Sequence, residues 1–222
     1  MDYNSVAAPR SASAGIEINK VLKNTYLLLS ATILFSAVTA FVSMSMGVSH
    51  SAYLFSVIGA MILGIFVLPR TANSSAGIGV IFLITGMLGF GLGPIIGYYL
   101  QAPGGSQIVT TALGGTGIIF LGLSGYVLTT KKDFTFMAGF LFTGMMVMLL
   151  AILANLFLSI PALSLGISAG IIMLMSGFIL FDTSRIVRGG ETNYIMATYG
   201  MYLSIFNIFI NLLNILGFMG DE

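Results

Sequence analysis

The sequence is poor in every residue type that a water-soluble protein uses to cover its surface. Only 7% of its 222 residues are Asp, Glu, Lys or Arg, whereas about a quarter is usual for soluble domains. Cysteine is absent and histidine occurs once. This excludes a disulfide framework, a thiolate metal site and a histidine cluster for metal chemistry. The formal net charge of +1 argues against a nucleic-acid partner.

What the chain has instead is long stretches without charge. No Asp, Glu, Lys, Arg or His interrupts residues 24–49, 71–130 or 134–181. A helix that crosses a lipid bilayer needs roughly 20 mostly apolar residues. Because lipid offers no hydrogen bonds to the backbone, only helices or closed barrels can cross it. Uninterrupted apolar runs, without the alternation of strands, predict an all-α membrane protein.

Short segments rich in turn-forming residues divide these runs and predict seven transmembrane helices. The predicted helices occupy residues 25–48, 52–69, 76–99, 106–129, 134–157, 160–182 and 194–217. They form a transmembrane domain at 25–218, with a polar tail at 1–24 and a short acidic end at 219–222. The first hydrophobic segment lacks a small-residue cleavage site, so we expect a retained helix and not a signal peptide.

The basic residues predict the orientation of the chain. All eight Lys and Arg residues fall on one side of the bilayer, in the tail and in the second, fourth and sixth loops. The positive-inside rule makes that side the cytoplasm, with the N terminus inside and the C terminus outside. With an even number of helices the acidic C-terminal end would lie inside and no basic residue would change sides. The basic residues therefore predict which side is cytoplasmic more firmly than they predict how many helices there are.

A stripe of polar residues marks the last predicted helix, where Ser204, Asn207, Asn211 and Asn214 recur at steps of three and four. Unpaired amides are costly in lipid. We therefore expect this helix to lie at the centre of the bundle, surrounded by the other six. The stripe would either form hydrogen bonds between helices or line a polar cavity, and the sequence leaves both uses open.

A second pattern lies in the third predicted helix. Gly89, Gly93 and Gly97 repeat at intervals of four residues, a spacing that lets the backbone of another helix approach closely. We interpret these glycines as a packing surface.

The catalytic motifs that a membrane protein can carry are incomplete. The sequence GLSG at 122–125 reproduces the GxSG of rhomboid-type proteases, whose serine needs a nearby general base. The single His50 is predicted in an outer loop, far from Ser124 near the inner end of its helix, so we reject this pair. An aspartyl protease needs two membrane-embedded aspartates, and only Asp182 qualifies because Asp133 lies in a basic loop. No predicted helix contains a lysine for a retinal Schiff base. We expect no enzyme activity, no metal and no cofactor.

Asp182 is the one acid at the inner end of a predicted helix, and Arg185 follows three residues later on the same helical face. A breakable Asp182–Arg185 pair could act as a proton-sensitive latch. The same pair could instead fix the depth of the helix at the membrane interface, with a stability contribution of about 0–1 kcal/mol if exposed. Both interpretations stay open.

The segment FILFDTSRIVRGGETNYIMATYGMYLSIFNIFINLLNILG resembles the last two helices of the Bax inhibitor-1 family, which carry an aspartate at the end of the sixth helix and a polar-striped final helix. Five segments resemble the bacterial members of the family: KVLKNTYLLLS, LGPIIGYYL, YVLTTKKDFTF, ANLFLSIPALSLGISA and GGETNYI. The resemblance covers nearly the whole chain from Lys20 onward. It implies a seven-helix fold with the last helix surrounded by the other six, in the bacterial inner membrane, where the C terminus that the positive-inside rule puts outside would lie in the periplasm.

The resemblance also implies one of two activities. Bacterial members bind the membrane-anchored AAA protease FtsH and hold back its degradation of membrane proteins. Other members behave as pH-sensitive calcium leak channels, in which an aspartate pair joins the sixth and seventh helices. Asp182 matches the first aspartate, but Ser204 and Asn207 stand in the segment where the second would fall. One carboxylate cannot form that switch and binds calcium weakly. We therefore expect a non-catalytic regulator of FtsH, with a proton-gated cation leak through an Asp182–Arg185 latch as the alternative.

Overall fold

The computed structural model describes residues 9–49 and 51–220, and this part of the chain is almost entirely helical. The elements are α1 (Pro9–Ser45), α2 (Ser51–Ile62), a π-helix (Leu63–Val67), α3 (Leu68–Thr71), α4 (Ala76–Gln101), α5 (Gly105–Thr130), a 3₁₀-helix (Thr135–Met137), α6 (Ala138–Leu158), α7 (Pro161–Val187) and α8 (Tyr194–Gly220). No strand occurs within these residues. The predicted all-α fold is confirmed.

Seven helical segments of the described residues are long and apolar enough to cross a membrane, as predicted. α2, the π-helix and α3 follow one another without a break and form a single segment, Ser51–Thr71. The 3₁₀-helix precedes α6 in the same way, in the segment Thr135–Leu158. The chain is a multi-pass membrane protein.

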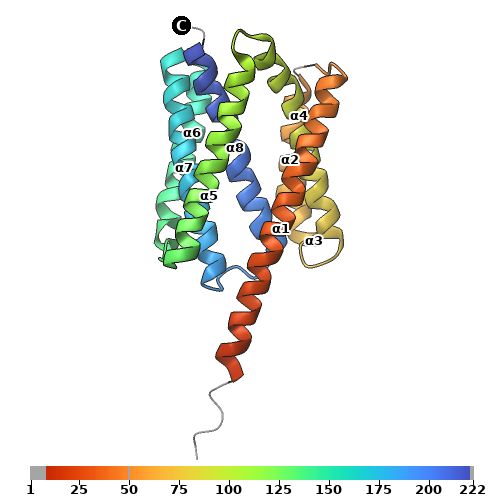
Figure 1. The fold of residues 1–222 in the computed structure, drawn as a ribbon. Helices are drawn as coiled ribbons and strands as arrows, with labels where there is room; N and C mark the ends of the chain where they lie inside the picture. The colour runs from red at the N-terminus through yellow and green to blue at the C-terminus, as the bar shows by residue number, and fades with distance from the viewer. Residues whose placement is uncertain (1–8, 50, 221–222) are drawn as a thin grey trace, which may run out of the picture.

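The first helix is longer than its membrane segment. α1 begins at Pro9, so residues 9–24 of the predicted polar tail continue the first transmembrane segment as helix. This extension projects from the bundle at the end where the loop between α7 and α8 lies (Figure 1). We call that end of the bundle the α1 end.

Local sequence explains several helix boundaries. Pro161 opens α7, where its missing N–H costs nothing and its fixed φ suits the first turn. α5 and α6 are followed by Lys131 and Ser159, whose φ values of 52° and 50° are left-handed. A left-handed residue ends a helix because it redirects the chain.

The last helix packs against four of the other helices. α8 contacts α1, α4, α5 and α7, whereas α2 packs on α4 and α6 packs on α7. Figure 1 shows α8 behind the space between α1 and α5. The expectation that all six other helices surround α8 is therefore not confirmed. α8 is nevertheless well buried, with side chains such as Met201, Ile208 and Leu213 wholly inside.

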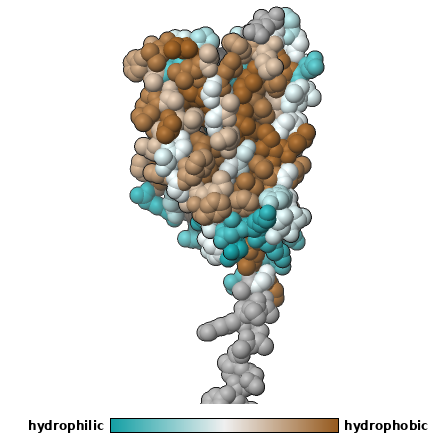
Figure 2. Space-filling model, turned by 90° about the vertical axis from the view of Figure 1, so that its left-hand side faces the viewer, coloured by the Kyte–Doolittle hydropathy of each residue, from teal (hydrophilic) through white to brown (hydrophobic). Residues whose placement is uncertain are grey.

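The outer surface of the bundle is apolar. Figure 2 shows brown, hydrophobic side chains over most of the face in view, and teal, hydrophilic ones mainly near the α1 end with a few at the opposite end. On α6 even the large side chains of Phe142 and Phe157 are 69% and 86% exposed. Such exposure would cause aggregation in water. It is the surface expected of a protein whose solvent is lipid.

The glycines of α4 let α1 approach closely, as expected. A Cβ atom at Gly89 would collide with the backbone oxygen of Ser36, and one at Gly93 would lie 2.7 Å from the backbone oxygen of Ala40. Gly97 is looser, because its nearest neighbour would be Met44 Cγ at 3.5 Å. Two backbones therefore meet at the first two glycines.

We predict that Gly93→Ala destabilises the bundle. The added methyl group would lie 2.7 Å from both Ala40 O and Ser43 Cβ, so α1 and α4 must separate. Overpacking of this kind typically costs about 1–3 kcal/mol. Thermal unfolding in detergent should show a lower midpoint temperature. Gly114→Ala is the matched control, because a Cβ atom at that position meets nothing within 4 Å. Equal midpoints for the two variants would contradict the prediction.

Candidate functional site

α7 ends in a Schellman turn that directs the following loop. The N–H of Gly190 donates to the carbonyl of Arg185 at 2.8 Å, and the N–H of Gly189 donates to that of Ile186 at 3.0 Å. Gly189 has a φ of 73°, a conformation that favours glycine. The N–H of Glu191 also donates to the Arg185 carbonyl, at 3.2 Å. The turn therefore returns Glu191 to the end of the helix that carries Arg185.

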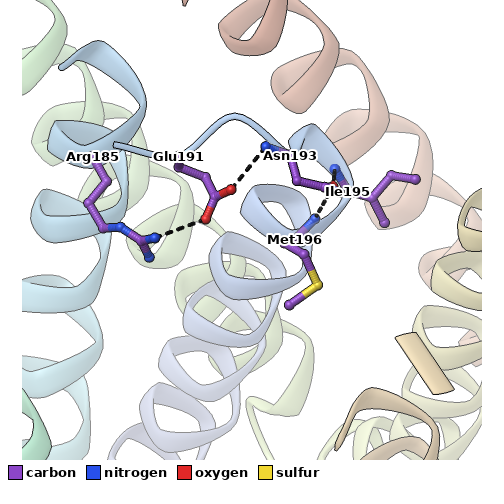
Figure 3. A network of polar contacts seen from close by, with 5 residues as sticks. All are labelled: Arg185, Glu191, Asn193, Ile195 and Met196. Atoms are coloured by element: carbon purple, nitrogen blue, oxygen red, sulfur yellow. Dashed lines mark hydrogen bonds and ion pairs between the residues drawn. The ribbon is translucent and has the colours of Figure 1, made fainter. Parts of the chain in front are cut away.

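A chain of polar contacts follows this turn (Figure 3). Arg185 Nη2 donates to Glu191 Oε2 at 3.1 Å, and Glu191 Oε1 accepts the backbone N–H of Asn193 at 2.9 Å. Asn193 Oδ1 then accepts the backbone N–H groups of Ile195 and Met196 at 2.9 and 3.1 Å. Asn193 is therefore the N-cap of α8. We call Arg185, Glu191 and Asn193 the loop network.

The loop network also reaches a neighbouring loop. Asn193 Nδ2 donates to the backbone oxygen of Ala72 at 3.1 Å and to Asn73 Oδ1 at 2.8 Å. One side chain thus caps α8 and joins it to the connection between α3 and α4.

Three further contacts attach the connection between α5 and α6 to the end of α7. Arg188 Nη2 lies 2.9 Å from Asp133 Oδ2. Ser184 Oγ donates to the backbone oxygen of Lys132 at 3.3 Å and accepts the N–H of Phe134 at 3.0 Å. All three loops at the α1 end are therefore linked to the end of α7 or the start of α8.

The charged groups of this loop are stabilised in their ionised forms. Asp133 Oδ1 accepts hydrogen bonds from the hydroxyl and the backbone N–H of Thr135 at 2.6 and 2.9 Å. These bonds, with a smaller contribution from Arg188, lower the pKa of Asp133 below its ordinary value of 3.8. The interaction with Tyr126 raises the pKa of Lys132.

Asp182 lies about one turn from the loop network, where α7 meets α8. A Cβ atom at Gly200 would lie 2.8 Å from Asp182 Oδ2, so the carboxylate uses space that the glycine leaves on α8. Arg185, the partner expected from the sequence, forms its ion pair with Glu191. No ion pair or hydrogen bond of the described side chains reaches the Asp182 carboxylate. The structure thus brings Asp182 to Gly200 and Arg185 to Glu191.

The polar stripe on α8 forms most of its hydrogen bonds within its own helix. Ser204, Asn207 and Asn211 each donate to the backbone carbonyl four residues earlier, at 2.8–3.2 Å. Asn214 instead donates to Ser168 Oγ on α7 at 2.8 Å. Of the two uses left open by the sequence, bonding between helices therefore applies to Asn214.

The serine of the GLSG sequence lies in a cluster of hydroxyl groups. Ser124 Oγ forms a hydrogen bond with the Tyr26 hydroxyl of α1 and accepts one from Thr183 Oγ1 of α7 at 3.5 Å. The histidine considered as its base, His50, lies outside the described residues. Across those residues, no group of three or more His, Cys, Asp or Glu side chains could hold a metal ion.

Sequence reasoning missed the roles of Glu191 and Asn193. Asn193 directly precedes the last apolar segment, and asparagine in that position is a recognised helix-start residue. The pairing of Glu191 with Arg185 depends on the turn at Gly189. The glycine pair that follows the helix containing Arg185 would have indicated a turn. It would not have indicated which acidic side chain the turn brings close to Arg185.

Comparison with known proteins places these features in context. The family described as "Inhibitor of apoptosis-promoting Bax1" matches residues 18–221. The chain is 48% identical to an uncharacterized membrane protein of Vibrio cholerae over 93% of each chain. It is 46% identical to the modulator of FtsH protease YccA of Escherichia coli over 98% of each chain. It is 44% identical to an uncharacterized protein of Pseudomonas aeruginosa, over 93% of this chain and 92% of the relative.

We predict that Asn193→Ala destabilises the protein more than Asn193→Ser. Alanine removes both the N-cap of α8 and the bonds to Ala72 and Asn73, whereas serine is a good N-cap without the amide donor. Loss of the cap costs about 0.5–2 kcal/mol. Thermal unfolding in detergent measures the difference. If both variants unfold at the same temperature, the cap contributes nothing and the assignment of Asn193 is wrong.

A second prediction concerns the pH dependence of the Arg188–Asp133 pair. Because the folded-state pKa of Asp133 lies below its ordinary value of 3.8, its stabilising effect is fully present above pH 3.8 and is lost as the pH falls through the lowered pKa. Thr135→Val removes one of the two bonds to the carboxylate and should raise this pKa. A titration of the Asp133 carboxyl carbon by NMR measures it. Thr129→Val is the control, because Thr129 bonds only to backbone oxygens of its own helix among its described contacts. An unchanged pKa in Thr135→Val would show that the Thr135 hydroxyl is not what lowers it.

Proposed function

This chain belongs to the Bax inhibitor-1 family, and from that premise we propose that it is a non-catalytic membrane regulator that binds the AAA protease FtsH and restrains its degradation of membrane proteins. The observation that carries the proposal is the identity of 46% over 98% of both chains to a protein named a modulator of FtsH protease. Similarity over nearly the full length means that the chain has a counterpart for almost every part of that relative.

The proposal assigns no catalytic step to the chain. Ser124 is engaged by two other hydroxyl groups, Tyr26 and Thr183, which are poor bases at neutral pH. Apart from Glu17 on the α1 extension, Asp182 is the one carboxylate in the membrane segments of the described residues, whereas an aspartyl protease needs two. These observations favour a role in binding over one in bond cleavage.

We place the chain in the bacterial inner membrane, with the α1 end in the cytoplasm and the C terminus in the periplasm. Basic residues gather in the loops and at the helix ends of the α1 end: Arg70 in α3, Lys131 and Lys132 after α5, Arg185 in the last turn of α7, and Arg188 directly after α7. The positive-inside rule assigns such loops to the cytoplasm. One relative is named an inner membrane protein, which supports the location.

The α1 extension is the part of the chain that we propose meets the protease outside the membrane. From Pro9 to Thr25 it can reach about 24 Å as a helix, at about 1.5 Å per residue. Ile16 is 70% exposed on this extension, so it offers an apolar side chain beside charged ones. Within the membrane, the contact would use exposed apolar faces, since Gly89 and Gly93 of α4 are already covered by α1.

We expect FtsH to co-purify with the full chain from native membranes in mild detergent. A tagged multi-pass protein of unrelated family, expressed at the same level, is the control for nonspecific recovery. A chain truncated to start at Gly15 should recover less FtsH, because part of the α1 extension is gone. Failure to recover FtsH with the full chain would overturn the proposed binding.

Restraint of the protease is measured separately. Overexpression of the chain should lengthen the half-life of a membrane protein that FtsH degrades, in a pulse-chase experiment. Asp182→Asn should leave this effect in place, because regulation by binding does not require a titrating carboxylate. An unchanged half-life with the wild-type chain would contradict the proposal, and an effect that vanishes in Asp182→Asn would favour the proton-gated leak.

A further inference from the structure

The proposed function does not use a groove in the side of the bundle. It has a volume of about 430 Å³ and is lined by α1, α4, α5 and α8. Its two walls are α1 and α5, which stand apart in Figure 1 with α8 behind them. Phe41 on one wall and Leu113 on the other are 65% and 57% exposed. The groove therefore opens sideways, toward the surrounding lipid.

The groove offers no hydrogen bonds to an occupant. The Tyr202 hydroxyl at its floor lies 2.6 Å from Ser36 Oγ and 3.3 Å from the backbone oxygen of Thr85. Thr116 Oγ1 donates to the backbone oxygen of Ala112 at 2.7 Å. The other lining residues have apolar side chains or are glycine. An apolar cavity of about 150 Å³ already excludes water and binds benzene, so this larger one calls for an apolar occupant.

The length of the groove matches one leaflet of a bilayer. Its lining extends from Ile33 to Met44 on α1 and from Val109 to Phe120 on α5. Each stretch rises about 16 Å at about 1.5 Å per residue, roughly half of the ~30 Å hydrocarbon core. Met44 is next to the last residue of α1 and Val109 lies in the second turn of α5. The groove therefore occupies the half of the membrane opposite the α1 end.

The groove ends where its lining ends, at Ile33 on α1 and Phe120 on α5, about halfway along the two membrane segments. Beyond this point Tyr26, near the α1-end limit of the membrane segment of α1, contacts Phe120 with ring centroids 6.1 Å apart and so joins the two helices. The hydrogen bond between Tyr26 and Ser124 joins the same two helices one turn farther toward the α1 end. A partner's transmembrane helix must cross both leaflets, and this closure stops it halfway. A lipid tail ends at the middle of the membrane, which is where the groove ends.

From this geometry we propose that the groove is a binding site for one acyl chain of a phospholipid in the leaflet opposite the α1 end. The chain lies between α1 and α5 against Phe206 and Phe209 of α8, and its terminal methyl group meets the Tyr26–Phe120 contact. The headgroup stays at the membrane surface. The site does not depend on the proposed binding of FtsH.

Gly117 offers a direct test. It lines the groove, and a Cβ atom there meets nothing within 4 Å, so a larger side chain can start from this position and we expect Gly117→Leu to fill the site. Gly114→Leu is the matched control, because Gly114 lies on the same helix with equal space but outside the groove lining. Ala37→Phe fills the groove from the other wall and serves as a second variant should Gly117→Leu fail to fold.

The experiment uses the full chain in nanodiscs that contain a phosphatidylethanolamine with a diazirine near the end of one acyl chain. After irradiation, mass spectrometry maps the labelled residues. We expect labelling of the groove walls to exceed that of the exposed face of α6. Gly117→Leu and Ala37→Phe should reduce groove labelling to the α6 level, and Gly114→Leu should leave it unchanged.

Three outcomes would overturn the proposal. Labelling that is equal on the groove and on α6 in the wild-type chain would mean that lipid touches both surfaces without a site. Labelling of the groove that persists in a folded Gly117→Leu variant would place the lipid elsewhere. Crosslinking of groove residues to a protein in native membranes, with no lipid adduct, would assign the groove to a partner helix instead.

Discussion

The absence of water in the bilayer is the constraint on which the rest of the structure depends. Each polar group in a membrane segment needs a partner within the protein. The nearest acceptor for a side chain is a backbone carbonyl of its own helix. Ser204, Asn207 and Asn211 each donate a hydrogen bond to the backbone carbonyl four residues earlier. These side chains then need no polar neighbour, so the helices can pack through apolar and small residues, as α1 and α4 do at Gly89 and Gly93.

At the α1 end, polar contacts join the loops that connect the helices. There Asn193 caps α8 and bonds to Ala72 and Asn73, while Arg188 pairs with Asp133. Water competes for exposed pairs, so each bond is weak by itself. Because the bonds join three loops, they restrain the relative positions of the helices that those loops connect. The loop network and the Arg188–Asp133 pair therefore help to hold the helices in place at this end.

The sequence predicted those features that depend on composition and spacing. Long uncharged runs revealed the seven membrane segments, and glycines at intervals of four predicted a close helix contact on α4, although not that its partner is α1. The sequence could not predict which group each polar side chain bonds to, because one side chain can often reach several acceptors. The spacing of Asp182 and Arg185 fits a helical pair, yet the turn at Gly189 offers Arg185 a different acid, Glu191. Spacing likewise could not tell that Asn207 bonds to its own helix. It also could not show that residues 9–24 are helical.

The periodicity of α1 explains why the groove exists. Its small polar residues Ser36 and Ser43 face α8 and α4, where Ser36 bonds to Tyr202 and Ser43 meets Gly93. The alternate stripe, which includes Ile33, Ala37 and Phe41, must then turn toward α5. Tyr26, a long side chain near the other end of the membrane segment of α1, spans the distance to α5. Close packing of α1 on α4 and α8 therefore leaves an apolar slot in one half of the membrane, where lipid takes the place that a protein side chain would fill.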